Sequence, residues 1–570
     1  MEKEIVYHVS PEKLERLRKT ESVSSDGSGA ELVIGSTNLY DENGDMRLIP
    51  APTPDPSDPL NLPQWRKNTA IGAVAFFGAL ALSAEAIIGA LVPVFALEYA
   101  GIDPKILSQV DLSLLNPPGV VNLDPLAPLA ALGGPPLWKI SLLSSLPLLT
   151  NGIASYFLVP LSISIGRRPV LLACGMLAWI GGLWAGFSHS LTTHIVARCI
   201  QAIGAGAVEA LIPLLVQDLV FIHQRNRAFA SIWSAQGLII VSLGIASPLI
   251  VSTIGWRFLY FLTSGVAIVA WIGLLLFVPE TRWIRSQQEL AGKTVHYVYP
   301  GERRPRLDEA TYGPRTKKTN FGLITFGIEN KEAVRSMIDT ARTMFFPIIL
   351  WAMAVNGIFI ALQLAAAQTG TSVLIAKGWT FKTLGLAVLP IVIATPFVYL
   401  ISGFAADKIS NVIAKRNGGR REPENHLPAM VIPLAFGVIG TLLFGYAGSY
   451  AKTTHWIVLI LGIFFISLGF LSANTMISVY AIESYPQWAG PVLVNISSWR
   501  CIIGFAMNFR ATAWAQQFGF LGSFGIYAGV LGGLMLFMPF LYVYGKRLRM
   551  RSAGTVKSRK APRKPEFNDY

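Results

Sequence analysis

The chain has 570 residues, of which 52% are hydrophobic and only 14% are charged. Soluble domains usually carry about a quarter charged residues, so this composition excludes a soluble protein and predicts a protein that crosses a membrane several times. The net charge of +14 does not indicate nucleic acid as a partner, because the Lys and Arg residues lie in loops and tails between apolar segments. There they orient a membrane protein and face the anionic lipid of the bilayer.

Cysteine and histidine give no sign of a disulfide framework or a metal site. The three cysteines, Cys174, Cys199 and Cys501, lie inside apolar segments without the close spacing of a metal motif. The seven histidines form no HxxH or HExxH pair. We therefore expect no metal and no cofactor. A membrane-embedded enzyme would need a histidine-rich or nucleophilic group within the spans, so we also expect a protein that is not an enzyme.

The first half of the chain follows a polar tail. Residues 1–67 are rich in Ser, Asp, Gly and Pro and lack the early apolar core of a signal peptide, which predicts a disordered cytoplasmic tail. Six apolar segments within residues 68–280 then predict spanning helices. Their bounds are about 69–99, 138–163, 169–187, a fourth that contains 198–218, 228–254 and a sixth that ends before Pro279.

The second half repeats this layout after a basic loop. Residues 281–343 are hydrophilic and rich in arginine, which predicts a central cytoplasmic loop. Within residues 344–545 the predicted spans are about 344–367, 383–406, 430–446, 455–483, 491–514 and 521–544. Residues 546–570 form a basic cytoplasmic tail. The sequence thus predicts an all-α membrane protein with twelve transmembrane helices in two six-helix halves.

Charged residues inside the predicted spans are the candidates for function. At about 100° per residue, Arg198, Gln201 and Glu209 share one stripe that extends over roughly 16 Å of a helix. Glu85 is a second acid, near the middle of the first span. Charges at this depth are costly unless they face a cavity or a partner, so a function is the default interpretation and a structural ion pair is the alternative.

Each type of polar side chain suits a different role. A carboxylate can change its charge as it faces each side of the membrane, so Glu85 and Glu209 are candidates for proton coupling. Arg198 keeps its charge and can only act as a counter-charge or bind an anion. Amides can hydrogen-bond a polar substrate, although each could equally be an interhelical packing contact. The candidates are Gln201, Asn356, Gln363, Asn474 and Asn495.

Several motifs resemble the major facilitator superfamily over about residues 66–544. The turn after the second span keeps Gly166, Arg167 and Arg168, with Ile163 where the family has an acid, and its counterpart in the second half keeps Gly403 and Asp407. The family motif R-x-x-Q-G-x-G is matched at Arg198, Gln201 and Gly204, with Ala202 in place of the first glycine. The fungal drug:proton antiporter branch is indicated by DPLNLPQWRK, GRRPV, FVPETR, RNGGRREPENHL and AIESYP.

This resemblance implies a function, with alternatives. It implies the major facilitator fold and a monomeric secondary transporter that uses protons to export a small organic compound, such as a drug, toxin or secondary metabolite, across the plasma membrane. Ser247-Pro248 stands where the antiporter motif ends in Gly-Pro, so uptake of a cationic metabolite such as a polyamine is the alternative. The vacuolar membrane and a receptor-like sensor built on this fold also stay open.

Charges at the cytoplasmic helix ends suggest a gate. The motif positions Arg167, Arg168, Asp218 and Asp407 lie at inner ends of predicted spans rather than at mid-depth. We expect them to form a charge network that latches the two halves, and opening of this latch would allow the rocking motion of alternating access. The simpler alternative is that these residues only orient the protein in the membrane.

Overall fold

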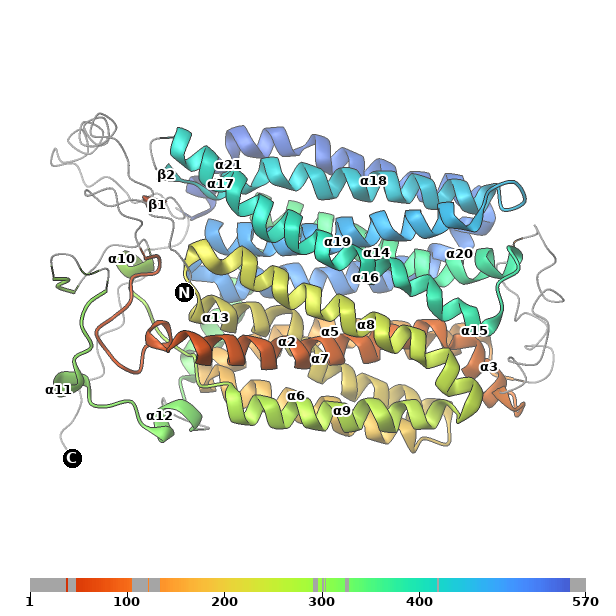
Figure 1. Ribbon diagram of the computed structural model, residues 1–570, viewed down its shortest axis with the longest axis horizontal. Helices are drawn as coiled ribbons and strands as arrows, with labels where there is room; N and C mark the ends of the chain where they lie inside the picture. The colour runs from red at the N-terminus through yellow and green to blue at the C-terminus, as the bar shows by residue number, and fades with distance from the viewer. Residues whose placement is uncertain are drawn as a thin grey trace.

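The computed structural model describes residues 37–38, 48–104, 121, 134–290, 296–299, 302, 304–322, 328–417 and 420–553. Long helices dominate this part of the chain and run side by side along the longest axis of the molecule (Figure 1). Eleven of its helical segments are long and apolar enough to cross a membrane. Together with the 27-residue helix α2 (Gln64–Ala90), they correspond to the twelve predicted spans.

The first half contains seven main helices. After α2 come α3 (Val92–Tyr99), α5 (Leu137–Ile165), α6 (Arg167–Gly186), α7 (Leu191–Leu219), α8 (Arg225–Thr253) and α9 (Trp256–Phe277). The predicted first span, 69–99, is interrupted at Leu91, and α3 begins one residue later. Pro93 lies in the first turn of α3, where a proline is tolerated because no hydrogen bond is required of its nitrogen.

The second half has a similar series of helices. It consists of α14 (Pro347–Ala376), α15 (Phe381–Leu384), η5 (Gly385–Val388), α16 (Leu389–Val398), the π-helical turn η6 (Tyr399–Ala405), α17 (Ala406–Arg416), α18 (Leu427–Ser449), α19 (Trp456–Ser484), α20 (Ala489–Leu536) and α21 (Met538–Ala553). The predicted spans 491–514 and 521–544 meet within α20 at a kink, where Gly519 has a φ of 72°. Glycine adopts this left-handed conformation without steric cost.

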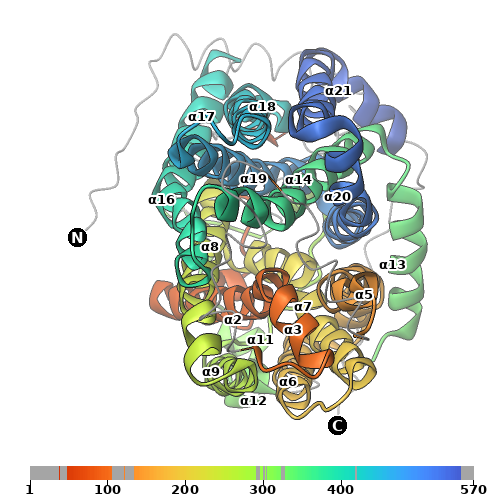
Figure 2. The ribbon, with the colours of Figure 1, turned by 90° about the vertical axis from the view of Figure 1, so that its right-hand side faces the viewer.

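The two halves lie against each other along the whole bundle. Viewed along the helices, α8 meets α16 at one side of the boundary and α5 meets α20 at the other (Figure 2). A Cβ on Gly152 of α5 would lie 3.0 Å from the Ser498 carbonyl oxygen of α20, so the absence of a side chain permits this approach. One large apolar core lies in the second half, and the other lies mainly in the first half but also includes Val479, Leu493 and Val494 of α19 and α20.

The segment between the halves contains short helices. They are α10 (Gln287–Leu290), α11 (Glu309–Tyr312), α12 (Lys317–Phe321) and the longer α13 (Asn330–Thr343), which lies beside α5 and α20 (Figure 2). A two-residue strand β1 (Thr37–Asn38) pairs with β2 (Arg420–Arg421) in the second half. We call the end of the bundle that carries these elements the basic end.

Residues 48–63 are ordered at the basic end, contrary to the prediction of a disordered tail through residue 67. Ile49 and Leu60 are 1% and 0% exposed, and the Ile49 carbonyl oxygen accepts a hydrogen bond from Ile222 N at 2.7 Å. The short helix η1 (Pro59–Asn61) is capped by Asp58, and α2 already begins at Gln64. Residues 1–36 and 39–47 of the predicted tail lie outside the described residues.

Asp58 explains why composition alone failed here. Its buried carboxylate contacts Arg285 at 2.6 and 3.1 Å and accepts hydrogen bonds from Thr53 and Leu60. A segment rich in proline and polar residues is therefore held in part by an ion pair with a residue more than two hundred positions away. Local composition carries no information about such a partner.

We expect Asp58→Ala to lower the thermal stability of the protein strongly. The substitution leaves the Arg285 guanidinium, whose side chain is 7% exposed, without its carboxylate, and breaking a buried ion pair in this way costs about 3–5 kcal/mol. Thermal unfolding of the purified protein in detergent measures the effect. Glu302→Ala is the control, because its pair with Arg306 is largely exposed and contributes little. Equal shifts for both variants would contradict the structural role of Asp58.

Candidate functional site

The predicted stripe on α7 contains a buried hydrogen-bonded pair. Arg198 is 1% exposed, and its guanidinium donates to Gln201 Oε1 at 2.6 Å. Helix α6 approaches this pair closely, since a Cβ on Gly182 would lie 3.0 Å from Gln201 Nε2 and 2.6 Å from Ser264 Oγ of α9. The structure thus confirms that Arg198 and Gln201 share one face, and it shows that this face includes contacts with α6 and α9.

His194 extends the stripe by one turn, which the sequence analysis missed. Its ring is fully buried, with hydrogen bonds to the Tyr99 hydroxyl at 2.9 Å and the Tyr260 hydroxyl at 2.8 Å. These contacts join the ends of α3, α7 and α9 that lie far from the basic end (Figure 1). The spacing of four residues between His194 and Arg198 was the signal that could have revealed it.

The two candidate coupling carboxylates lie on helices of the first half. Glu209 is on α7, two turns beyond Gln201 toward the basic end, and Glu85 is on α2. Their side chains lie outside the described part of the structure. Their proposed role in coupling therefore stays a prediction.

Asn356 is the most unusual polar residue of the second half. It lies inside α14 and is 0% exposed, yet among the described residues neither its amide nitrogen nor its amide oxygen has a hydrogen-bond partner. A buried amide without a partner costs about 1–3 kcal/mol. Gln363, seven residues further along α14, receives only a long hydrogen bond of 3.5 Å from Ser467.

Asn474 forms a second polar pair, with an arginine that was not among the predicted site residues. Arg500 of α20 donates to Asn474 Oδ1 of α19 at 2.9 Å, and both side chains are 3% exposed. The Arg500 guanidinium also lies 5.9 Å from the ring centroid of Phe470. Each half therefore has a spanning helix with a buried arginine that donates to an amide oxygen, Arg198 on α7 in the first half and Arg500 on α20 in the second.

Asn495 differs from the other predicted amides because protein groups already occupy its hydrogen bonds. Its nitrogen donates to the Thr340 carbonyl oxygen at 2.8 Å and to Thr343 Oγ1 at 3.0 Å, and its oxygen accepts from Tyr156 at 3.2 Å. These contacts fasten α20 to α13 and α5. They favour a positioning role over direct contact with a substrate.

The predicted gating residues of the first half form a cluster at the basic end. Arg167 lies 3.2 Å from Asp218, while the Arg168 side chain donates to carbonyl oxygens at the end of α9. Glu280, in the FVPETR motif, accepts the backbone N–H groups of Arg167 and Arg168 at 2.9 and 3.2 Å. Glu280 thus caps the start of α6, a role that the sequence analysis did not assign.

An equivalent cluster lies at the basic end of the second half. Glu483, at the end of α19, contacts Arg421 at 3.0 Å and His426 at 3.1 Å, and all three side chains are at most 2% exposed. Arg421 follows the eighth span as Arg167 follows the second, and Glu483 ends the tenth span as Asp218 ends the fourth. The internal repeat therefore extends to the charge pairs at the helix ends.

Of the four predicted gating residues, Asp407 is the one that contacts the opposite half. Its Oδ1 accepts a hydrogen bond from Asn226 of α8 at 2.6 Å, and its Oδ2 lies 3.9 Å from Arg227. Asp407 is 4% exposed. In the described part of the chain, the polar contacts of Arg167, Arg168 and Asp218 lie within the first half and the segment that follows it.

The halves also touch near the other end of α8. A Cβ on Gly385 of η5 would lie 3.1 Å from the Ile245 carbonyl oxygen. The structure therefore joins the two halves at both ends of α8, and Arg198, Asn356, Asn474 and Arg500 are buried within the bundle between these ends. Two six-helix halves that enclose polar side chains near mid-depth are the architecture of a secondary transporter.

The chain belongs to the major facilitator superfamily, whose family model matches residues 74–508. It is therefore a multi-pass membrane transporter and not an enzyme, as predicted. It is 25% identical over 418 residues to the efflux pump FUB11 of Gibberella fujikuroi, which covers 70% of this chain and 69% of that protein. It is also 21% identical, over an alignment of 590 positions, to the protein HOL1 of Saccharomyces cerevisiae. This alignment covers 91% of this chain and 92% of HOL1.

Solved structures share the fold. The proton:xylose symporter XylE aligns with a TM-score of 0.56 at 15% identity, over 84% of this chain and 96% of that one. The human organic anion transporter MFSD10 aligns with a TM-score of 0.53 at 17% identity, over 84% and 100%. These likenesses confirm the predicted major facilitator fold.

Proposed function

We propose that the protein exports a small organic compound in exchange for protons, by alternating access of a site between its two halves. The efflux pumps among its fungal relatives support export, as do the antiporter-branch motifs of the sequence. We further propose that the basic end faces the cytoplasm of a plasma-membrane monomer, because arginine and lysine collect at this end.

The unpaired amide of Asn356 is the observation that carries this proposal. A buried amide in the middle of a spanning helix is costly, and this cost is recovered when a substrate or water fills its hydrogen bonds. Asn474 also keeps a buried Nδ2 that has no partner among the residues that the structure describes. We assign substrate recognition to these two amides, with Gln363 from the same half and Arg198 and Gln201 from the first half.

Proton coupling is assigned to Glu209, with Glu85 as the second candidate. A carboxylate that loses its proton to one side and regains it from the other links the direction of substrate movement to the proton gradient. Arg198, roughly three helical turns from Glu209, is too distant for a direct ion pair along one helix. From this spacing we expect Glu209 to keep the ability to exchange its proton.

Asp407 is assigned to the gate at the basic end. Separation of the halves at this end requires loss of its contacts with Asn226 and Arg227, whereas the Arg167–Asp218 and Arg421–Glu483 pairs can move with their own halves. Rigid-body movement of this kind is the general mechanism of alternating access.

Uptake of a cationic metabolite, such as a polyamine, is the second candidate function. It is favoured by the two intramembrane acids and by Ser247-Pro248, which replaces the Gly-Pro of the antiporter motif. Both candidate functions use the proton gradient. In export by exchange, protons and the compound cross the membrane in opposite directions, whereas in proton-coupled uptake they cross it in the same direction.

Proteoliposomes with an acidic lumen distinguish these functions. We expect exchange to concentrate the compound in the lumen while the lumen pH rises, with a panel of small organic compounds that includes spermidine and rhodamine 6G. Accumulation in the alkaline compartment would instead establish proton-coupled uptake. Compounds that bind the purified protein but never cross the membrane would point to a sensor. Liposomes without protein are the control for passive leakage.

A further inference from the structure

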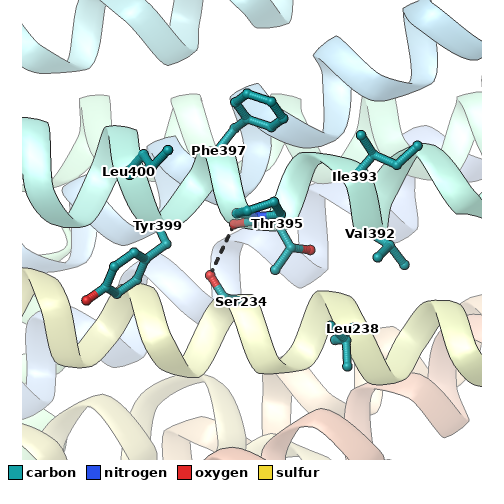
Figure 3. A pocket seen from close by; sticks show the side chains of 9 residues that line it. Ser234, Leu238, Val392, Ile393, Thr395, Phe397, Tyr399 and Leu400 are labelled. Carbon is teal, nitrogen blue, oxygen red and sulfur yellow. Dashed lines mark hydrogen bonds between the residues drawn. The ribbon is translucent and has the colours of Figure 1, made fainter.

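The two sides of the boundary between the halves are built differently. On one side α8 and α16 meet directly, and a hydrogen bond runs from Ser234 Oγ to the Thr395 carbonyl oxygen at 3.5 Å (Figure 3). On the other side, where α5 meets α20, helix α13 lies beside both of them. Figure 2 shows α13 lengthwise while the spanning helices are seen end-on, so α13 runs crosswise to the bundle.

The polar side of α13 faces the bundle. Its buried residues are all polar, namely Ser336, Asp339, Thr340 and Thr343. Asn495 of α20 donates to the Thr340 carbonyl oxygen at 2.8 Å and to Thr343 Oγ1 at 3.0 Å. At the other end of α13, the Glu329 backbone N–H donates to the Ser164 carbonyl oxygen of α5 at 3.4 Å. Helix α13 is thus fixed to one helix of each half.

The apolar side of α13 faces away from the bundle. Val334, Met337 and Ile338 are 56%, 39% and 48% exposed. At about 100° per residue, these three residues and Ala341 lie within a sector of about 100°, which we call the apolar sector. A helix on the surface of a soluble protein has the opposite arrangement, with its apolar face toward the core. The reversal indicates that the surroundings of α13 are themselves apolar.

The depth of α13 identifies these surroundings as the edge of the bilayer. Asn495 lies about 9 Å along α20 from its first residue, Ala489, and Ser164 is next to the last residue of α5. The contacts with Asn495 and Ser164 therefore place α13 level with the ends of the spans. Interfacial helices lie at this level, about 5–10 Å into the boundary between headgroups and acyl chains. Phe345, which is 68% exposed, continues the apolar surface toward α14.

Basic side chains border the apolar sector on one side. Lys331, Arg335 and Arg342 are exposed and lie within about 40° of one another around the helix, next to Ile338. Arg335 lies 3.9 Å from Glu332 in a pair that is open to the surroundings and contributes little. A row of cations beside an apolar stripe is the pattern of a helix that lies in an anionic membrane surface.

We propose that α13 binds anionic phospholipid in the leaflet at the basic end. The apolar sector lies among the first carbons of the acyl chains, and Lys331, Arg335 and Arg342 contact the charged oxygens of the headgroups. Because α13 is fixed to α5 and α20, the bound lipid also supports this side of the boundary between the halves. The proposal does not depend on the direction of transport or on its coupling to protons.

A nitroxide spin label on the full-length protein in lipid nanodiscs measures the depth of α13. Ala341→Cys places the label in the apolar sector, and Thr311→Cys, on the exposed helix α11, is the control for water. We expect oxygen, which concentrates in hydrocarbon, to relax the first label more than a water-soluble nickel complex does, with the reverse order for the control. Stronger relaxation by nickel at both positions would overturn the proposal, because the apolar sector would then face water.

Brominated lipids test the preference for anionic headgroups. A fluorophore on Ala341→Cys is quenched by phospholipids that carry bromine on their acyl chains, so competition between brominated and ordinary lipid gives a relative binding constant. We expect phosphatidylserine to bind more tightly than phosphatidylcholine at this position. Equal quenching by the two brominated lipids at equal content would overturn the proposal, because α13 would then contact bilayer lipid of any kind.

Single neutral substitutions test the basic row. Lys331→Gln and Arg342→Gln should each lower the preference for phosphatidylserine about fivefold, which corresponds to roughly 1 kcal/mol per basic residue near an anionic surface. Arg306→Gln is the matched control, because it removes an exposed positive charge outside α13, in the segment between the halves. An equal loss in the control would overturn the proposal, because the preference would then follow the net charge of the protein.

Thermal unfolding in nanodiscs tests whether the bound lipid supports the bundle. A ligand that binds only the folded protein raises its unfolding temperature. We expect phosphatidylserine to raise the unfolding temperature of the unsubstituted protein, and to raise it less when Lys331→Gln and Arg342→Gln are combined. The same rise in both proteins would overturn the proposal, because the lipid would then act elsewhere on the bundle.

Discussion

Glu209→Gln is expected to abolish transport driven by a pH gradient while substrate binding persists. Glutamine keeps the size and the hydrogen-bonding capacity of the side chain but fixes its charge at zero. Glu209 lies on the helix that carries the buried Arg198–Gln201 pair, so the substitution changes one charge next to the proposed site without removing the pair. A carrier without its proton-exchanging group can still exchange substrate for substrate.

Two transport measurements on reconstituted protein decide this prediction. Uptake against a concentration gradient should be lost with a pH gradient present, and substrate counterflow without a gradient should remain. Glu98→Gln is the matched control, since Glu98 is a carboxylate of the same half in a partly exposed pair with Arg257 at 2.9 Å. A Glu209→Gln protein that still concentrates its substrate would transfer the coupling role to Glu85 or remove proton coupling from the proposal.

Asp407→Asn is expected to slow transport about tenfold with little change in substrate affinity, because a hydrogen bond to a charged group contributes about 1.5–3 kcal/mol. Asp407 joins the halves at the basic end through Asn226 and Arg227, and it makes these contacts without the buried amides of the proposed substrate site. Asparagine cannot attract Arg227, so the state in which the halves meet at this end loses stability. Because transport requires both arrangements of the halves in turn, destabilising one of them relative to the other slows the transport cycle.

The kinetic constants of transport measure this effect. We expect a lower maximal rate at an unchanged half-saturating concentration, and a larger mean distance between spin labels on α8 and α17 at the basic end. Lys408→Gln provides the control, because Lys408 is the exposed neighbour of Asp407. Reduced affinity with normal turnover would assign Asp407 to substrate recognition instead of the gate.

The polar stripe on α7 shows which contacts could be predicted from the sequence within one helix. Helical periodicity alone placed Arg198 and Gln201 on one face, and their hydrogen bond follows from a spacing of three residues. The same reasoning could have added His194. Periodicity could not show that Tyr99 and Tyr260, from two other helices, would hold the histidine ring.

For the other predicted site residues, the sequence could not show which of them have hydrogen-bond partners. Asn356 and Asn495 look alike in the sequence, as single amides inside apolar segments. Only the packing of α13 against α5 and α20 shows that Asn495 already has partners, whereas Asn356 has none in the described structure. Residues 330–343, which form α13, were predicted to lie in a hydrophilic loop, so no partner for Asn495 could be expected there.

The sequence by itself determined the membrane character, the two six-helix halves and the family of this transporter. These properties depend on apolar runs of about twenty residues, on basic residues between them and on short motifs, all of which are local. The tertiary structure decided which polar groups are paired, that residues 48–63 are ordered and that Asp407 contacts the opposite half. Each of these depends on contacts between residues far apart in the chain, such as Asn226 and Asp407, which are 181 positions apart. Helical periodicity within one segment cannot specify the partner that packing brings from another.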